Sequence, residues 1–336
     1  MSVPISFHEV MRWTDQQCAD YLEAQRWRDG PVCPKCGSEN PYRINRKTAT
    51  KNVVRSLYKC RDCRKQYTLT VGTIFEDSHI PLSKWFAAIY LMCSSKKGVS
   101  AHQIHRTLGI TYKSAWFVCH RVREAMRESD GPLSGIIEAD ETYVGGKSRR
   151  GHPVAHHERL AIDAEARGLS QKSWMRGRRH PRKDKAVVFG MMERGGRVRS
   201  MHVPDAGQAT LRPIMITNID TKKSRLITDG AGPYRIIKHE MPHSIIDHSQ
   251  EYVSFSNPEV HTQNIENYWS LVKRGIIGTW HHVGMPYLDQ YLREFDFRFN
   301  RRKISDAERF GALVAQVSGR RLTWYCRTSQ PENPYA

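Results

Sequence analysis

The chain has 336 residues, of which 39% are hydrophobic, so it can bury a large core and carry more than one domain. The 53 Lys and Arg residues against 34 Asp and Glu residues give a formal net charge of +19, which indicates a polyanionic partner such as nucleic acid. The most apolar run, residues 85–93, is too short to cross a membrane, and the N-terminus lacks the basic start and apolar core of a secretion signal. Composition therefore excludes a membrane-spanning protein and favours a cytoplasmic one over a secreted one.

Residues 1–30 form a helical lead-in. Thr14 and Gln17 have the spacing of a capping box, and apolar side chains recur at helical intervals as far as Trp27. We therefore expect one short amphipathic helix that begins after Thr14.

Residues 31–75 contain the clearest metal motif, which predicts a zinc ribbon. Two CxxC pairs, separated by 23 residues of largely β-type sequence, supply Cys33, Cys36, Cys60 and Cys63. Four thiolates in two such knuckles match tetrahedral structural zinc. Because four protein ligands leave no open coordination position, we expect this ion to hold a small module together and to take no part in catalysis. The other cysteines are scattered, as in a reducing compartment.

Residues 76–130 have a helical pattern that indicates a DNA-binding region. After a helix near residues 81–95, Ser100 and Thr111 are positioned to cap two further helices, and Gly109 provides the turn between them. This layout is that of a helix-turn-helix, although a plain helical bundle remains an alternative. On the helix-turn-helix interpretation, the residues that can face a DNA groove are Tyr112, Lys113, Ser114, Arg121 and Arg123.

The stretch GIIEADETYVGG, residues 135–146, is the centre of the remaining chain. A β-branched apolar run leads into Glu138, Asp140 and Glu141, which predicts a buried strand with carboxylates at its tip. Buried carboxylates must be neutralised, and a bound divalent cation does so. We interpret this stretch as part of a metal site.

Two later patterns supply matching acids. The sequence SRLITDG predicts a second short strand that ends near Asp229, and residues 261–275 form a helical pattern that carries Glu266. With 36 residues between Asp229 and Glu266, these two acids and Asp140 have the order and spacing of a two-metal phosphoryl-transfer site.

The elements around these acids predict one domain over residues 131–305. In chain order they are a hairpin at residues 186–203, a helix near residues 209–218, a short helix after Pro233 and a strand at residues 243–247. This is the element order of a ribonuclease H-like α/β fold. The fold class is therefore an α+β multidomain protein, with a zinc ribbon and a helix-turn-helix followed by a ribonuclease H-like catalytic domain.

Two segments stand apart from this order. Residues 147–185 are an irregular insertion with twelve Lys and Arg against four Asp and Glu, which fits either a solvated loop or an arm that follows DNA phosphates. The C-terminal part begins with a helix that we expect to pack through Phe295 and Phe299 with its arginines outward. Residues 306–336 follow as a C-terminal tail.

Several motifs occur together and carry a family resemblance from about residue 13 to residue 302. They are CPKCG, TVGTIF, SKKGVSAHQIHRTLGITYKSAW, DETYVGG, ITDG, HTQNIENYWSLVKRGIIGTWHHV and FRFNRR. In this order they resemble the zinc-ribbon insertion-sequence transposases with a DDE catalytic site, the insertion-sequence fifteen-ninety-five family, which is related to the eukaryotic Merlin elements. The basic insertion is bulkier than the family pattern.

The resemblance implies a DNA transposase that excises and transfers a mobile element. Asp140 then matches the first catalytic acid, Asp229 the second, and either Glu266 or Asn264 the third, with Lys273 as the basic residue that follows. Glu266 and Lys273 are seven residues apart and share a helix face, which favours Glu266 as the ligand and Asn264 as a capping residue.

The implied mechanism also predicts the cofactors and partners. Two Mg²⁺ ions (or Mn²⁺) at the acids stabilise the charge that develops on the attacking and leaving oxygens, while zinc stays structural. The partners are double-stranded DNA, as element ends and as target, and further copies of the chain in a homodimer or higher oligomer on DNA. No membrane partner is expected. The implied location is a prokaryotic cytoplasm, in association with the nucleoid.

Two other functions fit the same motifs. One is a non-catalytic DNA-binding regulator derived from a transposase. The other is a ribonuclease H-like nuclease that cuts nucleic acid without strand transfer.

Overall fold

The protein divides into two compact units. Unit 1 is formed by Met1–Asp130 together with Gln290–Ala336, and unit 2 by Gly131–Asp289. By this division residues 290–305, the last part of the predicted catalytic domain, pack with unit 1. A computed structural model describes residues 5–44, 56–128, 131–145, 185–230, 232–246 and 257–323. Among the described helices, none combines the length and apolar character that a bilayer crossing requires.

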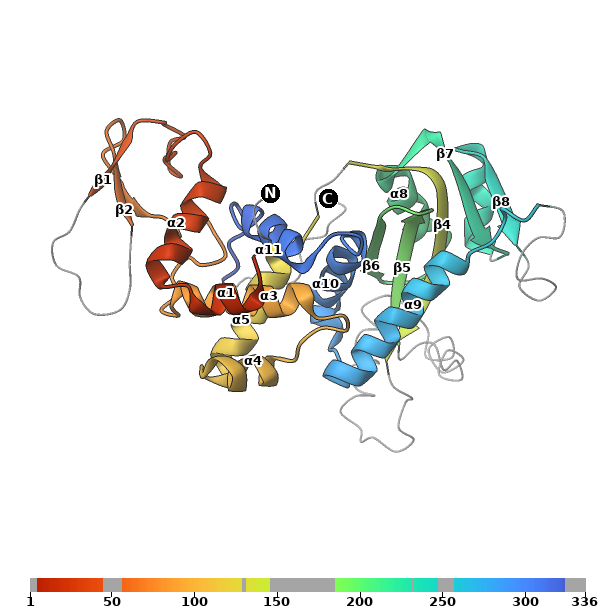
Figure 1. Cartoon of the computed structure of the whole chain (residues 1–336). Coiled ribbons are helices and arrows are strands. Elements are labelled where there is room, and N and C mark those ends of the chain that lie inside the picture. Colours follow the sequence, from red (N-terminus) through yellow and green to blue (C-terminus); the bar gives the residue numbers. More distant parts are fainter. Residues whose placement is uncertain are drawn as a thin grey trace, which may run out of the picture. The chain divides into compact units, whose positions relative to one another are not determined.

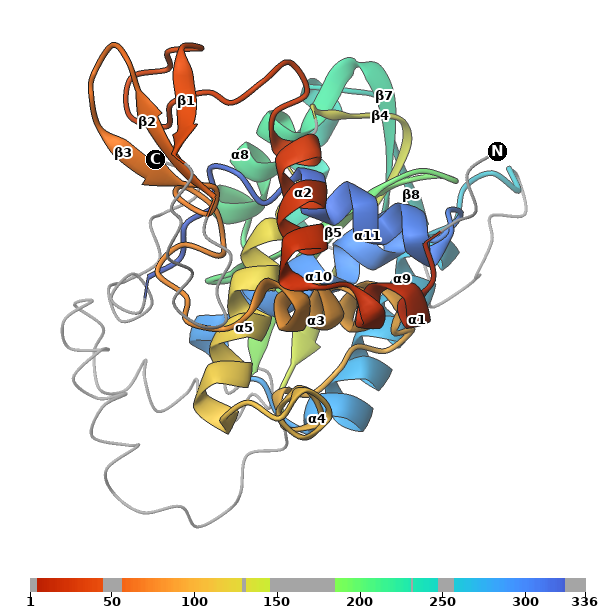
Figure 2. The same ribbon diagram turned by 60° about the vertical axis from the view of Figure 1, so that its left-hand side comes forward.

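Unit 1 contains a small three-stranded antiparallel sheet in the order β1-β2-β3. Figure 2 shows this sheet at one end of α2. The strands are β1 (Pro41–Ile44), β2 (Leu57–Cys60) and β3 (Gln66–Thr68). Tyr58 and Tyr67 are paired across β2 and β3 and stack with ring centroids 5.6 Å apart, so an aromatic pair holds the two strands together.

The rest of unit 1 is helical (Figure 1). The predicted capping box at Thr14 and Gln17 is confirmed, and Ser6 and Glu9 form a second box that begins a helix absent from the prediction. The predicted caps at Ser100 and Thr111 are also confirmed, and Gly109 ends the helix before it in the left-handed conformation that favours glycine. The helices are α1 (Phe7–Arg12), α2 (Asp15–Arg26), α3 (Leu82–Ser94), α4 (Ala101–Leu108), α5 (Tyr112–Ala125), α10 (Leu288–Asn300) and α11 (Asp306–Ala315).

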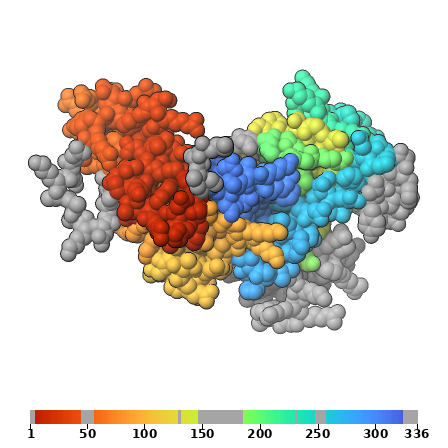
Figure 3. Space-filling model, viewed as in Figure 1, coloured from red at the N-terminus to blue at the C-terminus, as the bar shows by residue number. Residues whose placement is uncertain are grey.

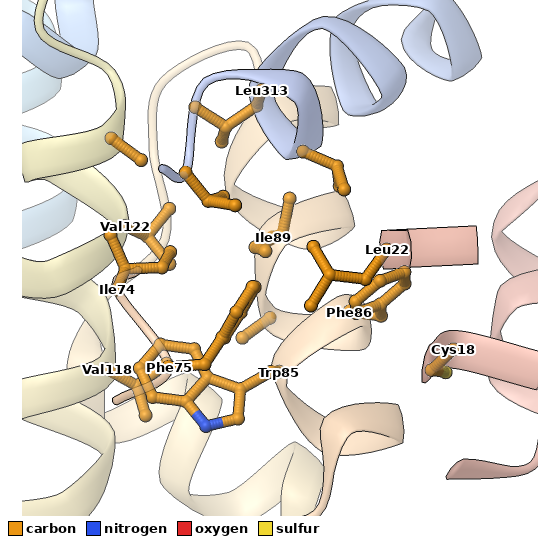
Figure 4. Packing of buried hydrophobic residues seen from close by; sticks show 14 of the residues in the cluster. Cys18, Leu22, Ile74, Phe75, Trp85, Phe86, Ile89, Val118, Val122 and Leu313 are labelled. Carbon is orange, nitrogen blue, oxygen red and sulfur yellow. The ribbon is translucent and has the colours of Figure 1, made fainter. Parts of the chain in front are cut away.

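An aromatic core joins the two separated segments of unit 1. Figure 4 shows Phe75, Trp85 and Phe86 packed beside Leu22 from α2 and Leu313 from α11. The rings of Phe86 and Phe310, another residue of α11, lie 5.6 Å apart, edge to face. Because α11 fills this core, the C-terminal segment folds with the N-terminal one.

Helix α10 is buried differently from the prediction. Phe295 is fully buried, as expected. Arg298, which was expected to point outward, is only 7% exposed and pairs with the buried Glu294 one turn earlier. The neighbouring carboxylate makes burial of this arginine possible.

Unit 2 is built on a five-stranded mixed sheet in the order β6-β5-β4-β7-β8. β4, β5 and β6 pair antiparallel, which confirms the predicted hairpin, and β4, β7 and β8 pair parallel. β4 lies in the centre and its inner residues are buried on both faces. The strands are β4 (Leu133–Val144), β5 (Ala186–Glu193), β6 (Val198–Val203), β7 (Ile219–Asp229) and β8 (His243–Ile246).

Helices cover both faces of this sheet. α8 (Gln208–Asn218) and the 3-10 helix η1 (Gly232–His239) pack on one face in a core that includes Ile137, Ala139 and Leu226. α9 (Gln263–Gly275) crosses β4 and β5 on the other face (Figure 1), and the space-filling view shows it on the surface of unit 2 (Figure 3). Side chains alternate along a strand, so residues 138 and 140 of β4 point to the α9 side. After α9 follow η2 (Ile276–Trp280) and η3 (Met285–Tyr287).

Candidate metal and carboxylate sites

The four predicted cysteine ligands come together in unit 1. One Sγ atom from each of Cys33, Cys36, Cys60 and Cys63 lies within 4.8 Å of all the others. The Sγ atoms of Cys33 and Cys63 are 3.7 Å apart, as are those of Cys36 and Cys60. A tetrahedral zinc ion with Zn–S bonds of about 2.3 Å requires sulfurs about 3.8 Å apart, so the cluster fits zinc.

Tight turns shape each of the two cysteine knuckles. The N–H of Gly37 donates to the carbonyl of Cys33, and that of Cys60 donates to the carbonyl of Lys65. Gly37 and Arg64 have positive φ angles of 72° and 58°, which lets the chain reverse close to the sulfurs. Backbone N–H groups that face the sulfur lower the pKa of Cys60 to about 6, which favours the thiolate that binds a metal.

Asp140 and Asp229 lie on neighbouring parallel strands of unit 2. The parallel pairing of β4 with β7 ends at Glu138 opposite Ile227, and each aspartate is two residues further along its strand. Both carboxylates therefore point from the same edge of the sheet. Asp140 is not at a strand tip as predicted, because β4 continues to Val144 through its pairing with β5.

Asp140 is held under α9. Its Oδ2 accepts a hydrogen bond of 3.0 Å from Nε1 of Trp269, whose ring lies over Gly190, the residue opposite Asp140 on β5. Burial raises the pKa of Asp140 to about 7, and the negative charges of Glu141 and Asp229 add to the rise. A cation beside this carboxylate would offset both effects.

Glu141 faces the opposite side of the sheet from Asp140. The buried hydroxyl of Tyr234 donates to Glu141 Oε2, and burial followed by the charge of Glu141 raises the pKa of Tyr234. Glu141 therefore adds negative charge near the aspartates from a position beneath them.

The two candidates for the third catalytic residue are in different environments on α9. Glu266 is exposed, and its Oε1 accepts a hydrogen bond of 2.9 Å from the hydroxyl of Thr262. Asn264 instead donates its side-chain amide to Glu138, 2.7 Å away. Lys273 is exposed on the same helix. Over the described part of the chain, only the cysteines form a group of three or more side chains within reach of one ion, so Glu266 is not brought together with the aspartates.

Sequence reasoning missed the roles of Glu138 and Trp269. Glu138 is two residues before Asp140, so the alternation of a strand already puts both on one face. Trp269 is three residues after Glu266, a spacing that puts the two on adjacent parts of one helix surface. Arg194, which pairs with Glu138, carried no such signal because it lies in a hairpin turn far along the chain.

The predicted DNA-contacting residues of α5 divide into two groups. Tyr112 and Lys113 are exposed and Ser114 is partly so. Arg121 and Arg123 are buried, which corrects the expectation that they face a groove. Arg121 donates to the backbone carbonyls of Ile74, Glu76 and Leu322, and Arg123 pairs with Glu294 at 2.7 Å. Both arginines therefore stabilise the fold of unit 1 through these buried contacts. The basic residues 147–184 lie outside the described residues.

Comparison with known proteins gives the class of this molecule. Residues 13–66 match the transposase zinc-ribbon domain, and residues 132–300 match the ISXO2-like transposase domain. A zinc-binding ribbon followed by a transposase domain of mixed α/β structure defines an insertion-sequence transposase.

The chain belongs to the family of transposases with the ISXO2-like domain. It is similar to an uncharacterized protein in transposable element ISH50 of Halobacterium salinarum, with 30% identity over 296 residues that cover 85% of this chain and 90% of that protein. No solved structure matches it. The four cysteines of the ribbon provide its structural zinc site.

Proposed function

We propose that this transposase binds the ends of an insertion sequence, cleaves them to release 3′-hydroxyls and transfers these to target DNA. The observation that carries the proposal is the aspartate pair of unit 2, Asp140 and Asp229, at one edge of two neighbouring parallel strands, with Asp140 bonded to Trp269 of α9. Paired carboxylates of this kind bind the cations used in phosphoryl transfer.

The domain arrangement supports the same function. Three antiparallel strands followed by two parallel ones, with helices on both faces, are consistent with a ribonuclease H-like catalytic fold in unit 2. In unit 1, the capped helices α4 and α5 and the turn at Gly109 are consistent with a helix-turn-helix. We infer that Tyr112, Lys113 and Ser114, at the start of α5, contact element-end DNA.

The aspartates fit a hard divalent cation such as Mg²⁺ or Mn²⁺. Both offer carboxylate oxygens, and the raised pKa of Asp140 marks a position that a cation would stabilise. When bound, such ions stabilise the negative charge of the attacking and leaving oxygens. The chain itself supplies Asp140, oriented by Trp269, and Asp229 at the end of β7.

Glu266 is the better third residue. The side-chain N–H of Asn264 donates to Glu138, which gives Asn264 a structural role at the start of α9. Glu266 is one helical turn from Trp269, which touches Asp140, and its carboxylate is the stronger ligand for Mg²⁺. Lys273, seven residues further on nearly the same face, is placed to meet the DNA backbone.

The assembly on DNA is proposed to be a homodimer or higher oligomer. An element has two ends, and one aspartate pair per chain serves one strand at a time. The net charge of +19 supports tight binding of DNA by each copy.

Duplex oligonucleotides that carry the element end test the proposal. Wild-type protein with Mg²⁺ is expected to nick the end and to join it to a second duplex. Asp140→Asn and Asp229→Asn should each lower both rates by about 10³-fold, since several kcal/mol of charge stabilisation is lost at about 1.4 kcal/mol per tenfold.

The same assay separates the alternatives. Binding of element ends with no cleavage by wild-type protein would indicate a DNA-binding regulator. Cleavage without joining would indicate a nuclease. Full activity of both aspartate variants would refute the assignment of the site.

A further inference from the structure

Glu138 is a buried carboxylate next to the aspartate pair that has no role in the proposed chemistry. We propose that Glu138 is a positioning residue, which fixes the first turn of α9 and thereby sets Glu266 and Trp269 relative to Asp140. This inference rests on the proposed function, because it concerns the residues that hold the third ligand.

The first observation is an unusual helix start. An α-helix leaves its first N–H groups without partners inside the helix, and the side chain of the N-cap residue usually accepts from one of them. Thr262 is the N-cap of α9, but its side chain makes no such bond. Instead, Glu138 Oε2 accepts from the backbone N–H groups of Asn264 at 2.9 Å and Ile265 at 3.1 Å. The helix is capped by a residue of the central strand.

The second observation is that both oxygens of this carboxylate are used. Glu138 Oε1 accepts from the Asn264 side chain at 2.7 Å and from Nη2 and Nε of Arg194 at 2.8 and 3.1 Å. Glu138 is fully buried, so it needs the positive charge of Arg194 and the positive end of the helix. Five donors leave it no capacity to act as a metal ligand.

Arg194 extends the connection to the chain that precedes α9. Its Nη1 donates to the carbonyl of Glu259 at 2.7 Å, and its Nη2 to that of His261 at 3.1 Å. The Arg194–Glu138 pair thus connects three segments: the hairpin turn after β5, the centre of β4 and the residues that lead into α9. The start of α9 cannot shift without breaking several charge-assisted hydrogen bonds.

The capping of α9 by Glu138 also affects Glu266, through the side chain of Thr262. Because Glu138 caps the helix, the hydroxyl of Thr262 is directed to Glu266 Oε1, 2.9 Å away. Thr262 is 2% exposed, so its side chain is shielded from water. One turn later, Trp269 donates to Asp140. Since a helix is stiff over two turns, one fixed end determines where both side chains lie.

Glu138→Gln is the most direct test, because it keeps the shape and replaces one acceptor oxygen with an NH₂ group that must face donors. Glu240→Gln is the matched control: it removes another carboxylate of unit 2, one that pairs with Arg212 of α8 on the opposite face of the sheet from α9.

The readouts are metal binding and local protection in zinc-loaded, full-length protein. Mn²⁺ is added with no other ligand, and its binding is measured from the electron paramagnetic resonance signal of the free ion. Glu138→Gln should weaken Mn²⁺ binding by about 10–100-fold, the range found when residues that orient metal ligands are changed. Amide exchange over residues 262–269 should become faster in the same variant. Glu240→Gln should change neither quantity.

A double variant tests the route of the effect. If Glu138 acts through Glu266, adding Glu138→Gln to Glu266→Gln should weaken Mn²⁺ binding no further. If Glu138→Gln weakens Mn²⁺ binding by the same factor in the Glu266→Gln background as in wild-type protein, the proposal is overturned. It is also overturned if Glu138→Gln behaves like Glu240→Gln. If Glu138→Gln does not fold, Asn264→Ala removes the side-chain hydrogen bond to Glu138 Oε1 and keeps the two backbone hydrogen bonds to Oε2. It should raise amide exchange and weaken Mn²⁺ binding by a smaller factor, and no change in either quantity would overturn the proposal.

Failure of the proposed function looks different. Wild-type protein would then neither bind Mn²⁺ at Asp140 and Asp229, as judged by the Asp140→Asn variant, nor cleave element ends. If wild-type protein does both and the Glu138 variants have no effect, only the positioning role is wrong.

Discussion

The cysteine site of unit 1 and the carboxylate site of unit 2 are assembled over different distances along the chain. The cysteines come as two pairs on adjacent turns of one small sheet, and each turn is shaped by its own backbone hydrogen bonds. The aspartates come from two strands separated by an antiparallel hairpin and a helix. α9 packs against Asp140, where Glu138 caps the helix and Gly190 leaves room for the Trp269 ring.

This difference teaches where each site is vulnerable. A site with local ligands depends on the ligands themselves, since little else positions them. A site assembled by a sheet and a helix also depends on residues that never touch the metal or DNA. Substitutions of the cysteines should therefore disrupt the site of unit 1 most. The site of unit 2 should also be disrupted by substitutions of residues that position its carboxylates.

The largest expected effect is loss of the structural zinc. Structural zinc contributes about 10–16 kcal/mol of binding free energy in small zinc modules, so Cys60→Ser with Cys63→Ser should unfold the ribbon. Metal analysis should find zinc falling from about one equivalent to less than half, with loss of element-end binding. Mn²⁺ binding by unit 2 should be unchanged. Retention of zinc by the double variant would contradict the site.

The next effect concerns Glu266 and Asn264. Glu266→Gln should lower cleavage and strand transfer by about 10²–10³-fold at matched DNA affinity, because the carboxylate that we propose as the third metal ligand is lost. Asn264→Ala should reduce cleavage and strand transfer much less, by an amount equivalent to about 1 kcal/mol, because it removes one of the hydrogen bonds to Glu138. Full activity of the Glu266 variant together with an inactive Asn264 variant would reverse the assignment.

A smaller effect is expected at Gly190. An added Cβ would lie 2.5 Å from an atom of the Trp269 ring, and that ring is buried and bonded to Asp140. Gly190→Ala should therefore destabilise the protein by about 1–3 kcal/mol, measured by urea unfolding. Gly232→Ala is the control, since a Cβ there meets nothing within 4 Å. Equal stability of the two variants would show that the ring moves without cost.

The smallest effect is expected at the surface of unit 1. Lys113→Ala should weaken binding to element-end DNA and lower the slope of log affinity against log salt by about one, with no change in stability. Lys223→Ala, a change at an exposed lysine of unit 2, serves as the control. A salt slope that stays constant in the Lys113 variant would remove this residue from the DNA contact.

Much of the fold followed from local patterns. The caps at Thr14, Ser100 and Thr111 and the hairpin of β5 and β6 were predicted because side chains three residues apart, or a Gly-containing turn, specify such structures within a short window. The length of β7 was not predicted: it begins at Ile219, five residues earlier than the apolar pattern indicated, because pairing with β4 extends it.

Charged side chains were the main source of error. Arg121, Arg123 and Arg298 were placed at the surface because isolated arginines normally stay in water. Arg121 and Arg123 are buried because acceptors from distant segments face them in the folded unit, backbone carbonyls for Arg121 and Glu294 for Arg123. Arg298 is buried beside the same Glu294, which lies one turn earlier on its own helix. Partners from other parts of the chain are invisible to a pattern along one helix.

The sequence by itself determined the four zinc ligands, because residue type and spacing are enough when the ligands lie on short turns. It also nominated Asp140 and Asp229 as the candidate catalytic acids. The tertiary structure alone decided that β7 lies beside β4, that α9 is capped by Glu138, and that Asn264 is bonded to Glu138 while Glu266 is held by Thr262. The physical reason is that hydrogen bonds and burial between distant segments depend on sheet register and helix placement, which no local window of sequence contains.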